Sequence, residues 1–323
     1  MKTILFSAPY MTPFLDKFQS FFDQYDLKLI VPEVHERLEK DQLLEFAGEF
    51  DGTICGDDQY DAEVLNACAP RLKVISKWGT GIDSFDQEAA NKLDIKIFRT
   101  PNAFTLPVAD TVLGYILAFA RRQPWMDRAI KMGRWEKIPG HALSENTLGV
   151  IGVGNIGKAV LKRAQPFGMQ LLGNDIIEID QDFVDQVGVQ MTSLHDLLSR
   201  ADYISLNCDL NQTSFHLINS NTLPTMKSNA ILINTARGQV IDEPVLVKAL
   251  QSGIIAGAAL DVFEVEPIPP ESPLVKMDNV MLAPHNANSS PAAWEHVHWN
   301  TLRNLLIGLG ISPKGEENAP ESI

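Results

Sequence analysis

Short apolar runs alternate with amphipathic segments along the first hundred residues of the chain. Strands of a parallel sheet are buried on both faces and therefore have few polar positions, so such runs predict strands. The runs lie at 4–6, 27–31, 52–55, 72–76 and 95–98. Helical periodicity between them predicts helices over 13–22, 34–50, 62–68 and 86–93. This alternation predicts right-handed crossovers and a mostly parallel sheet with helices on both faces.

The same alternation returns in the second half of the chain. A long apolar segment at about 107–121 predicts a buried helix, because it contains Asp110 and is too short to cross a bilayer. The later strands are expected at 148–151, 203–207, 230–234, 255–260 and 280–282, with one more ending at Asp175. Helices are expected over 156–167, 179–187, 193–199, 221–226, 243–252 and 291–309, with Ser220 and Asp242 as N-caps. The polar residues from Pro313 onward predict a frayed tail.

A glycine motif follows the strand expected at 148–151. Gly152, Gly154 and Gly157 have the spacing GxGxxG between an apolar run and a helical pattern. The first glycine permits a tight turn, the second lets a pyrophosphate approach the backbone, and the third lets the helix lie close to the sheet. A glycine-rich turn alone occurs in many α/β domains. The complete order of strand, turn, helix, second strand and terminal acid indicates dinucleotide binding.

The acid at the end of the second strand indicates which dinucleotide binds. Asp175 lies roughly 20 residues after the motif, where a carboxylate accepts hydrogen bonds from the ribose hydroxyls of NAD. The same carboxylate repels the 2′-phosphate of NADP. The next residues, Ile176, Ile177 and Glu178, include no cation that could bind that phosphate. The sequence therefore favours NAD over NADP.

The composition narrows the classes of partner and compartment. The 323 residues suffice for two domains that each bury a core, and 45% hydrophobic with 21% charged residues is ordinary for a soluble protein. The net charge of −14 disfavours nucleic acid and anionic membranes as partners, although local cations can still bind small anions. Cys55, Cys68 and Cys208 lack metal or redox spacing, so we expect reduced thiols, no metal site and a cytoplasmic location.

Polar residues follow three of the strands expected in the second half. Ligands of open α/β sheets bind beyond the carboxyl ends of the strands, and the segments there contain Arg237, Glu266 and His285. Reduction of a 2-keto acid puts negative charge on the C2 oxygen. A protonated imidazole can deliver a proton there, a carboxylate stabilises the imidazolium, and a guanidinium grips the substrate carboxylate at two points.

Each of these three residues has a structural alternative. Arg237 can be an ion-pair partner, Glu266 a solvated loop acid and His285 the cap of a turn, and for each one alone a structural role is the commoner case. Their occurrence together at strand ends of one dinucleotide-binding domain favours catalysis. The other histidines match no motif and are interpreted as surface or packing residues: His35, His141, His195, His216, His296 and His298.

The motifs around these residues resemble those of the D-isomer-specific 2-hydroxyacid dehydrogenases. This group includes D-3-phosphoglycerate dehydrogenases and glyoxylate or hydroxypyruvate reductases. The matching segments are GVGNIG, ILINTARG, ALDVFEVEP, MLAPH, LKVISKWGTGIDSFD and residues 102–117. Several motifs in the family's order, spread over nearly the whole chain, are far more specific than any single one.

The resemblance implies an α/β fold of two doubly wound parallel-sheet domains. A Rossmann NAD-binding domain at 102–287 is inserted into a flavodoxin-like substrate domain formed by 1–101 plus 288–323. The family binds its substrate in a cleft between the domains that closes to exclude water. It usually forms homodimers through the NAD-binding domain, for which the apolar region 106–135 is suited.

The resemblance also implies a role for individual residues. Arg237 binds the substrate's carboxylate and carbonyl, His285 is the acid/base, and Glu266 orients and charges His285. Backbone amides cradle the substrate carboxylate in the loop of Lys77, Trp78, Gly79, Thr80 and Gly81. Further contacts with the cofactor are implied for Thr80, Asn155, Ile156, Cys208, Thr235, Ala236, Asp261 and Asn288.

The chain departs from the family pattern at three places. NANSS follows His285 where relatives usually carry a glycine pair and a hydroxyl residue, so the contact at Asn288 is less firmly implied. The run 208–210 reads CDL where His or Thr, Pro and Leu are common. Asp57 and Asp58 stand where phosphoglycerate dehydrogenases tend to place an arginine near the substrate phosphate. Two acids repel a phosphate, which Lys77 compensates in part.

The predicted function is hydride transfer between NAD(H) and a small D-2-hydroxy acid or 2-keto acid, either glyoxylate- or hydroxypyruvate-like or 3-phosphoglycerate. The alternative enzyme is the D-3-phosphoglycerate dehydrogenase of serine biosynthesis. Phosphite oxidation uses a similar Arg, Glu and His set, whereas formate dehydrogenases place Gln where Glu266 stands. An alternative of another class is an NAD(H)-sensing, corepressor-like binding protein, which binds NADH without consuming it.

Overall fold

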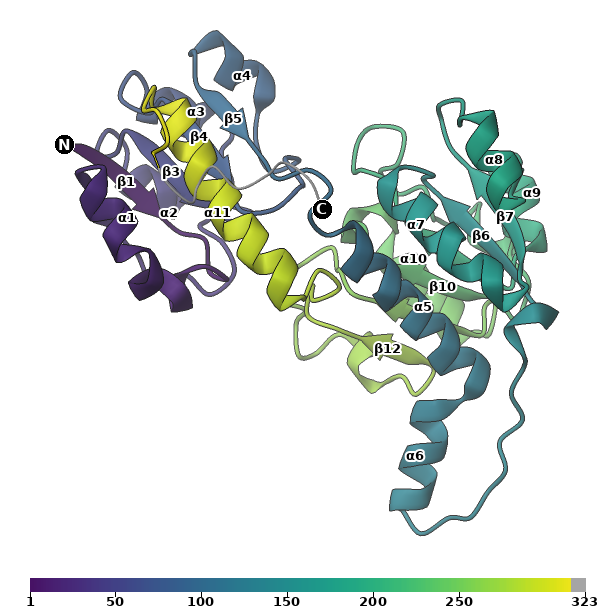
Figure 1. The fold of residues 1–323 in the computed structure, drawn as a ribbon. Coiled ribbons are helices and arrows are strands. Elements are labelled where there is room, and N and C mark those ends of the chain that lie inside the picture. The colour runs from purple at the N-terminus through teal and green to yellow at the C-terminus, as the bar shows by residue number, and fades with distance from the viewer. Residues whose placement is uncertain (315–323) are drawn as a thin grey trace. The chain divides into compact units, whose positions relative to one another are not determined.

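The chain folds into two compact units. The computed structural model describes residues 1–314, so most of the expected frayed tail lies outside the described residues. Met1–Phe104 and the segment from Ser290 onward form the first unit, and Thr105–Ser289 forms the second (Figure 1). In the sequence, the second unit is thus inserted between two segments of the first. No helix in residues 1–314 is long and apolar enough to cross a membrane.

The first unit is built on a five-stranded parallel sheet in the order β2-β1-β3-β4-β5. Its strands are β1 Lys2–Phe6, β2 Leu27–Ile30, β3 Gly52–Cys55, β4 Val74–Lys77 and β5 Lys96–Phe98. Its helices are α1 Gln19–Gln24, α2 Lys40–Glu45, α3 Ala62–Cys68, α4 Gln87–Lys92 and α11 Pro291–Gly308, with the 3-10 helix η1 Thr12–Phe18. The strand order 2-1-3-4-5 is that of flavodoxin-like folds.

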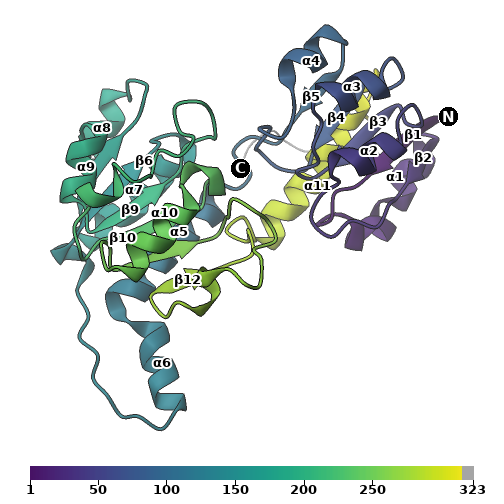
Figure 2. The ribbon, with the colours of Figure 1, turned by 180° about the vertical axis from the view of Figure 1, so that it is seen from behind.

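The last helix belongs to this unit because it packs directly on the sheet. A Cβ atom at Gly308 of α11 would lie 2.1 Å from Cγ2 of Val74 in β4. Ser76 of β4 donates its Oγ hydrogen to the carbonyl of Thr301 on α11 over 2.7 Å. The C-terminal helix therefore covers one face of a sheet whose strands come from the first hundred residues (Figure 2).

The second unit has a seven-stranded parallel sheet in the order β12-β11-β10-β9-β6-β7-β8. Its strands are β6 Thr147–Ile151, β7 Gln170–Asn174, β8 Gln190–Met191, β9 Tyr203–Leu206, β10 Ile231–Asn234, β11 Gly257–Leu260 and β12 Val280–Leu282. Its helices are α5 Thr105–Arg121, α6 Gln123–Lys131, α7 Asn155–Ala164, α8 Gln181–Val187, α9 Leu194–Arg200 and α10 Glu243–Gln251. The 3-10 helices are η2 Leu143–Glu145, η3 Gln165–Phe167, η4 Leu223–Thr225, η5 Gly238–Val240 and η6 Pro273–Lys276. The sheet has the Rossmann order with one added strand.

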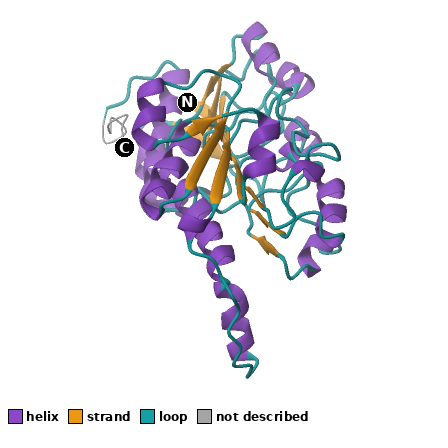
Figure 3. Ribbon diagram, turned by 90° about the vertical axis from the view of Figure 1, so that its right-hand side faces the viewer, coloured by secondary structure: helices purple, strands orange, loops and turns teal. Residues whose placement is uncertain are grey.

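Both faces of the second sheet carry a hydrophobic core. Ile231 and Ile233 of β10 belong to the cluster that includes α5 and α7, whereas Leu232 belongs to the cluster that includes α9 and α10. Successive side chains of a strand point to opposite faces, so a strand covered on both sides is apolar throughout. Figure 3 looks onto the second unit and shows strands between helices. The predicted doubly wound α/β class is confirmed for both units.

The helix expected over 34–50 is wrong in its first half. Only α2, Lys40–Glu45, is α-helical there. Glu39 begins it with a capping box, in which its side chain and that of Gln42 each bind the other's backbone N–H. Just before this cap, the amide of Leu38 donates to the buried carboxylate of Asp58 over 3.0 Å. A long-range hydrogen bond therefore holds the preceding segment out of the helix.

Two further predictions in the second unit are corrected. The helix expected over 221–226 is only the 3-10 turn η4, because Pro224 cannot donate a backbone hydrogen bond. Ser220 is not an N-cap, since Thr222 precedes that turn, whereas Asp242 caps α10 by accepting from Val245. Helix α6 and the short strand β8 were not expected from the sequence pattern.

Asp58 is fully buried at the end of β3. Its carboxylate accepts hydrogen bonds from the Ser7 hydroxyl and, over 3.0 Å, from the Leu38 amide. Burial raises the pKa of Asp58 to about 6, although both hydrogen bonds act in the opposite direction. In the unfolded chain an aspartate titrates near pH 3.9. The folded protein thus holds this proton more tightly than the unfolded chain does.

We expect Asp58→Asn to become more stabilising relative to the natural protein as the pH rises. The stability from protonated Asp58 is fully present below about pH 4 and is lost as the pH rises through about 6. A shift of about two pKa units corresponds to about 3 kcal/mol. Urea unfolding of both proteins at several pH values between 4 and 8 measures this change. Asp41→Asn, at an exposed position, is the control, and a pH-independent difference for Asp58→Asn contradicts the expectation.

Candidate active site

The glycine motif forms the turn from β6 into α7. Gly152 has φ +86°, and a Cβ atom there would lie 2.6 Å from the amide nitrogen of Cys208. A Cβ atom at Gly157 would lie 2.0 Å from the carbonyl oxygen of Gly152. Helical hydrogen bonding starts with the amide of Lys158, which donates to Gly154 over 2.8 Å. The helix N-terminus therefore directs backbone N–H groups and its positive dipole end outward from the sheet, as a pyrophosphate site requires.

Asp175 lies beside this turn at the end of β7. One carboxylate oxygen accepts from the Val153 amide over 2.6 Å, and the other accepts from the Ile177 amide over 3.1 Å. Each oxygen keeps a second lone pair that can accept from a ribose hydroxyl. The neighbours Ile176 and Ile177 are 77% and 66% exposed and apolar. Glycines, helix end and acid together fit NAD, whose two phosphates and adenosine ribose need these groups.

Asn155 and Ile156, which are also implied to contact the cofactor, are the first two residues of α7. Four more such residues follow the ends of β9, β10 and β12. Cys208 lies against Gly152, and burial raises the pKa of its thiol to about 11. The hydroxyl oxygen of Thr235, just after β10, is buried and has no hydrogen-bond partner among residues 1–314. Ala236 and Asn288 are half-buried. These contacts stay predictions.

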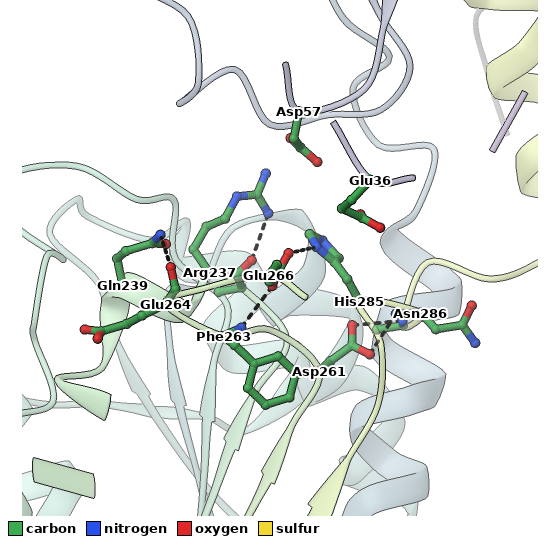
Figure 4. Close-up of polar contacts among 12 residues, drawn as sticks. Glu36, Asp57, Arg237, Gln239, Asp261, Phe263, Glu264, Glu266, His285 and Asn286 are labelled. Carbon is green, nitrogen blue, oxygen red and sulfur yellow. Dashed lines mark hydrogen bonds and ion pairs between the residues drawn. The ribbon is translucent and has the colours of Figure 1, made fainter. Parts of the chain in front are cut away.

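Glu266 and His285 form a hydrogen-bonded pair (Figure 4). Oε2 of Glu266 lies 3.0 Å from Nδ1 of His285, and Oε1 accepts from the Phe263 amide over 2.9 Å. The side chains of Glu266 and His285 are 22% and 23% exposed. The carboxylate is thus fixed at both oxygens while the imidazole keeps access to solvent or ligand.

Asp261 holds the loop on which His285 lies. Its carboxylate accepts the amides of Asn286 and Ala287 over 2.8 and 2.9 Å, and its carbonyl accepts the amide of His285 over 2.7 Å. Asp261 is 1% exposed, and this burial raises the pKa of its carboxyl group. His285 itself has φ +49°, which a non-glycine residue adopts only where its surroundings enforce it. The implied contact of Asp261 with the cofactor stays a prediction.

Arg237 follows β10, the strand between β9 and β11. Its side chain is half-buried, and Nη1 donates to the carbonyl of Ala236 over 2.8 Å. The next residue, Gly238, lies against the peptide between Phe263 and Glu264, where a Cβ atom would approach the Phe263 carbonyl carbon to 1.9 Å. The segment with Arg237 therefore packs directly on the segment with Glu266, and both lie at the carboxyl edge of the sheet (Figure 4).

A second imidazole–carboxylate pair lies in the same region and was missed by the sequence analysis. Nε2 of His216 is 2.7 Å from Oε1 of Glu264. Glu264 lies within the segment ALDVFEVEP, two positions before Glu266, so the motif contained one partner. Nothing local marked His216, because the contact joins positions 48 residues apart.

In the first unit, β4 ends on the buried Lys77, and the loop after it begins with the buried Trp78. Lys77 is 3% exposed, and its Nζ lies 2.7 Å from Oδ1 of Asp57. The Trp78 amide donates to the Cys55 carbonyl over 2.8 Å, and its indole Nε1 donates to Nδ1 of His298 over 2.9 Å. Burial lowers the pKa of His298 to about 4, so this imidazole is neutral and able to accept that bond.

The rest of this loop offers backbone donors. Gly79 has φ +124°, and Thr80 donates its hydroxyl hydrogen to the Thr100 carbonyl over 2.9 Å. Among the described residues, the N–H groups of Gly79, Thr80 and Gly81 have no hydrogen-bond partner. Such a run of backbone donors suits a carboxylate. No group of three or more potential metal-ligating side chains occurs in the described part of the chain.

Comparison with known proteins matches these features to one family. The family model described as "D-isomer specific 2-hydroxyacid dehydrogenase, NAD binding domain" matches residues 113–287. A glyoxylate reductase of Korarchaeum cryptofilum is 42% identical over 77% of this chain and 76% of its own. A D-3-phosphoglycerate dehydrogenase of Methanocaldococcus jannaschii is 39% identical over 81% of this chain but only 50% of its own.

A solved structure agrees with these sequence matches. The D-lactate dehydrogenase of Aquifex aeolicus, complexed with NAD and lactic acid, has a TM-score of 0.84 at 26% identity. That match covers 95% of this chain and 96% of the other. The predicted family, reaction class and cofactor are thereby confirmed. The chain belongs to the D-isomer-specific 2-hydroxyacid dehydrogenases and is an NAD-binding oxidoreductase that transfers hydride between NAD(H) and small D-2-hydroxy or 2-keto acids.

Proposed function

We propose that the chain reduces small unphosphorylated 2-keto acids of the glyoxylate and hydroxypyruvate type, with His285 as the proton donor. The observation that carries this proposal is the hydrogen bond between Glu266 and His285 at the carboxyl edge of the Rossmann sheet. A glyoxylate reductase at 42% identity supports the class of substrate.

His285 delivers the proton in this mechanism. Bound NADH supplies the hydride to C2 of the keto acid, and negative charge grows on the C2 oxygen. Because Glu266 holds Nδ1, Nε2 is the ring atom that donates to this oxygen. The Glu266 carboxylate stabilises the imidazolium before the transfer and fixes the direction of the ring. General acid catalysis of this kind contributes roughly 10²- to 10⁴-fold.

Arg237 binds the substrate carboxylate in this proposal, and the loop after β4 is assigned to substrate binding. A guanidinium matches a carboxylate with two parallel hydrogen bonds, which also fixes the face of C2 that receives the hydride. In the first unit, the N–H groups of Gly79, Thr80 and Gly81 are donors of the kind that a carboxylate needs. Lys77 and Trp78 hold this loop in place, through Asp57 and through Cys55 and His298 respectively.

The charges around Lys77 disfavour phosphorylated substrates. Lys77 already binds Asp57 over 2.7 Å, and the carboxyl group of Asp58 lies close enough for Lys77 to lower its pKa. One acid thus pairs with the ammonium group at the end of β4, and a second acid interacts with it electrostatically. A phosphate needs an excess of positive charge or donors there, so we disfavour D-3-phosphoglycerate dehydrogenase activity.

We propose that NAD binds along the turn from β6 to α7. Gly154 faces the pyrophosphate and Asp175 binds the adenosine ribose. A Cβ atom at Gly154 would have no atom within 4 Å in the protein, so the fold itself does not require glycine there. The remaining contacts are assigned to Thr80, Asn155, Ile156, Cys208, Thr235, Ala236, Asp261 and Asn288.

We also propose that a second copy of the chain covers the apolar surface of α5, α6 and the segment after them. Leu106, Ile130, Met132 and Trp135 are 49%, 50%, 65% and 89% exposed. Large apolar side chains that stay exposed on one surface mark interaction sites. All four belong to the NAD-binding unit, through which the family dimerises.

A cytoplasmic location is proposed from the thiols. Cys55 and Cys68 are buried, Cys208 is half-buried, and none of the three forms a disulfide. Oxidising compartments favour disulfides, so three reduced cysteines are typical of the cytoplasm. Cell fractionation tests this assignment. Detection of the protein outside the cytoplasmic fraction would contradict it.

The test of the function is NADH consumption with a panel of keto acids: glyoxylate, hydroxypyruvate, pyruvate, 2-oxoisocaproate and 3-phosphohydroxypyruvate. We expect turnover of glyoxylate or hydroxypyruvate in preference to the phosphorylated compound. His285→Gln should lower kcat by roughly 10²- to 10⁴-fold while the Kd for NADH changes less than about twofold. NADH binding without turnover of any panel member favours the sensor alternative, and full activity of His285→Gln refutes the proton-donor role.

Gly154→Ala separates cofactor binding from folding. Because the added methyl group meets no protein atom, the free energy of unfolding should change by less than about 0.5 kcal/mol. The Kd for NADH, measured by fluorescence, should rise at least roughly tenfold, since the methyl group blocks the pyrophosphate. The contrasting variant is Gly157→Ala, whose Cβ atom clashes inside the protein and should lower stability as well. Unchanged NADH affinity in Gly154→Ala argues against this placement of the cofactor.

The proposed dimer is tested by light scattering after size exclusion. The natural protein should have twice the chain mass of 35.8 kDa. Met132→Lys combined with Trp135→Glu places charges on the apolar surface and should shift the mass toward one chain. A monomeric natural protein, or a variant with unchanged assembly, contradicts the proposed interface.

A further inference from the structure

Glu264 forms hydrogen bonds through its amide, its carbonyl and its side chain, although the next residue, Val265, is exposed. Its amide donates to Oε2 of Glu243 over 3.1 Å, and its carbonyl accepts from Nε2 of Gln239 over 3.2 Å (Figure 4). Gly238 lies directly against its peptide with Phe263. The side chain of Glu264 in turn lies within hydrogen-bond distance of His216, with Oε1 2.7 Å from Nε2. Only one residue separates this anchored position from Glu266.

His216 is fixed as firmly on its own side. Its amide donates to the carbonyl of Gln239 over 2.9 Å, and its carbonyl accepts from the side chain of Asn219 over 2.7 Å. The imidazole stacks on Phe215 with centroids 4.1 Å apart and an interplanar angle of 16°. A φ of +46° places the residue in the left-handed region. A non-glycine residue held there in a connecting segment marks a position whose conformation is enforced.

These contacts join three segments that follow neighbouring strands. His216 lies after β9, Gln239 after β10, and Glu264 after β11. The segment after β10 also contains Arg237, and the segment after β11 also contains Glu266. The chain segments that contain Arg237 and Glu266 are therefore joined to each other by the hydrogen bonds of His216, Gln239 and Glu264.

We propose that His216 and Glu264 are positioning residues for the reaction, which keep Glu266 directed at His285 and keep the segment of Arg237 in register with it. This inference rests on the proposed function, because it acts through Glu266 and His285. Within residues 1–314, the Glu266 carboxylate has two hydrogen bonds, to Phe263 and to His285. Its aim therefore depends on the conformation of residues 263–266, and the Glu264 side chain fixes the middle of that run.

The test measures the effect of His216→Asn first in the natural protein and then in the Glu266→Gln variant. Asparagine tolerates positive φ but is too short to reach Glu264, so the substitution removes the contact with little backbone strain. We expect kcat for keto-acid reduction to fall roughly 10- to 100-fold, because small misplacements of catalytic groups have effects of this size. The Kd for NADH should change less than about twofold. His216→Gln restores the reach of a donor nitrogen and should recover most of the activity.

The same substitution is then made in Glu266→Gln. A residue that acts through Glu266 has no further effect once Glu266 is replaced, so kcat should not fall again. The matched control is His195→Asn, an exposed histidine of the same unit, which should leave kcat unchanged in both backgrounds. If His216→Asn does not fold, as judged by thermal melting, Glu264→Gln takes its place in the same comparison.

The outcomes separate this inference from the function on which it rests. Equal losses of kcat in both backgrounds, or no loss in either, overturn the positioning role and leave the proposed function intact. Wild-type turnover by Glu266→Gln alone overturns the assignment of Glu266, and the positioning role falls with it. Loss confined to the background with natural Glu266, together with recovery in His216→Gln, supports the inference.

Discussion

The buried carboxylate of Asp261 accepts the amides of Asn286 and Ala287, while its carbonyl accepts the amide of His285. Three consecutive N–H groups of an irregular segment thus find partners on one residue at the end of β11. Hydrogen bonds to a carboxylate are stronger than neutral ones, and a low local dielectric strengthens them further. Such bonds can hold His285 at φ +49°, a conformation that costs of the order of 1 kcal/mol or more in a free chain.

The parallel sheet makes this arrangement possible by aligning the ends of its strands. Asn234 pairs with Leu260, and Leu260 pairs with Leu282, so β10, β11 and β12 end at the same level. The segments that follow them must emerge side by side. Arg237, Glu266 and His285 come together for this reason, although many residues separate them along the chain. The Rossmann core supplies the coarse position, and hydrogen bonds of Asp261, Phe263 and Glu264 supply the fine one.

This division explains how much the sequence could predict. Apolar runs predict the strands, and strand ends predict the edge where ligands bind. Arg237, Glu266 and His285 could therefore be named as candidates from their positions and from the family motifs around them. The contacts that fix them join distant positions and leave no periodic signal. His216 was therefore interpreted as a surface or packing residue, and the helix expected over 34–50 ignored the bond from Leu38 to Asp58. The local pattern of apolar residues predicts the helices and strands. Long-range hydrogen bonds determine where these elements end and how the side chains are oriented.

The charge distribution then shapes which anions the protein can bind. The chain carries a net charge of −14, and the buried Lys77 at the end of β4 is paired with Asp57. In the proposed function, anionic substrates are therefore bound by directed donors, namely a guanidinium and backbone N–H groups, rather than by a positive field. Such donors match the planar geometry of a carboxylate and its single charge. A phosphate brings a second charge, and the acids around Lys77 oppose it. The proposed discrimination against phosphorylated acids thus rests on the pairing of Lys77 with Asp57.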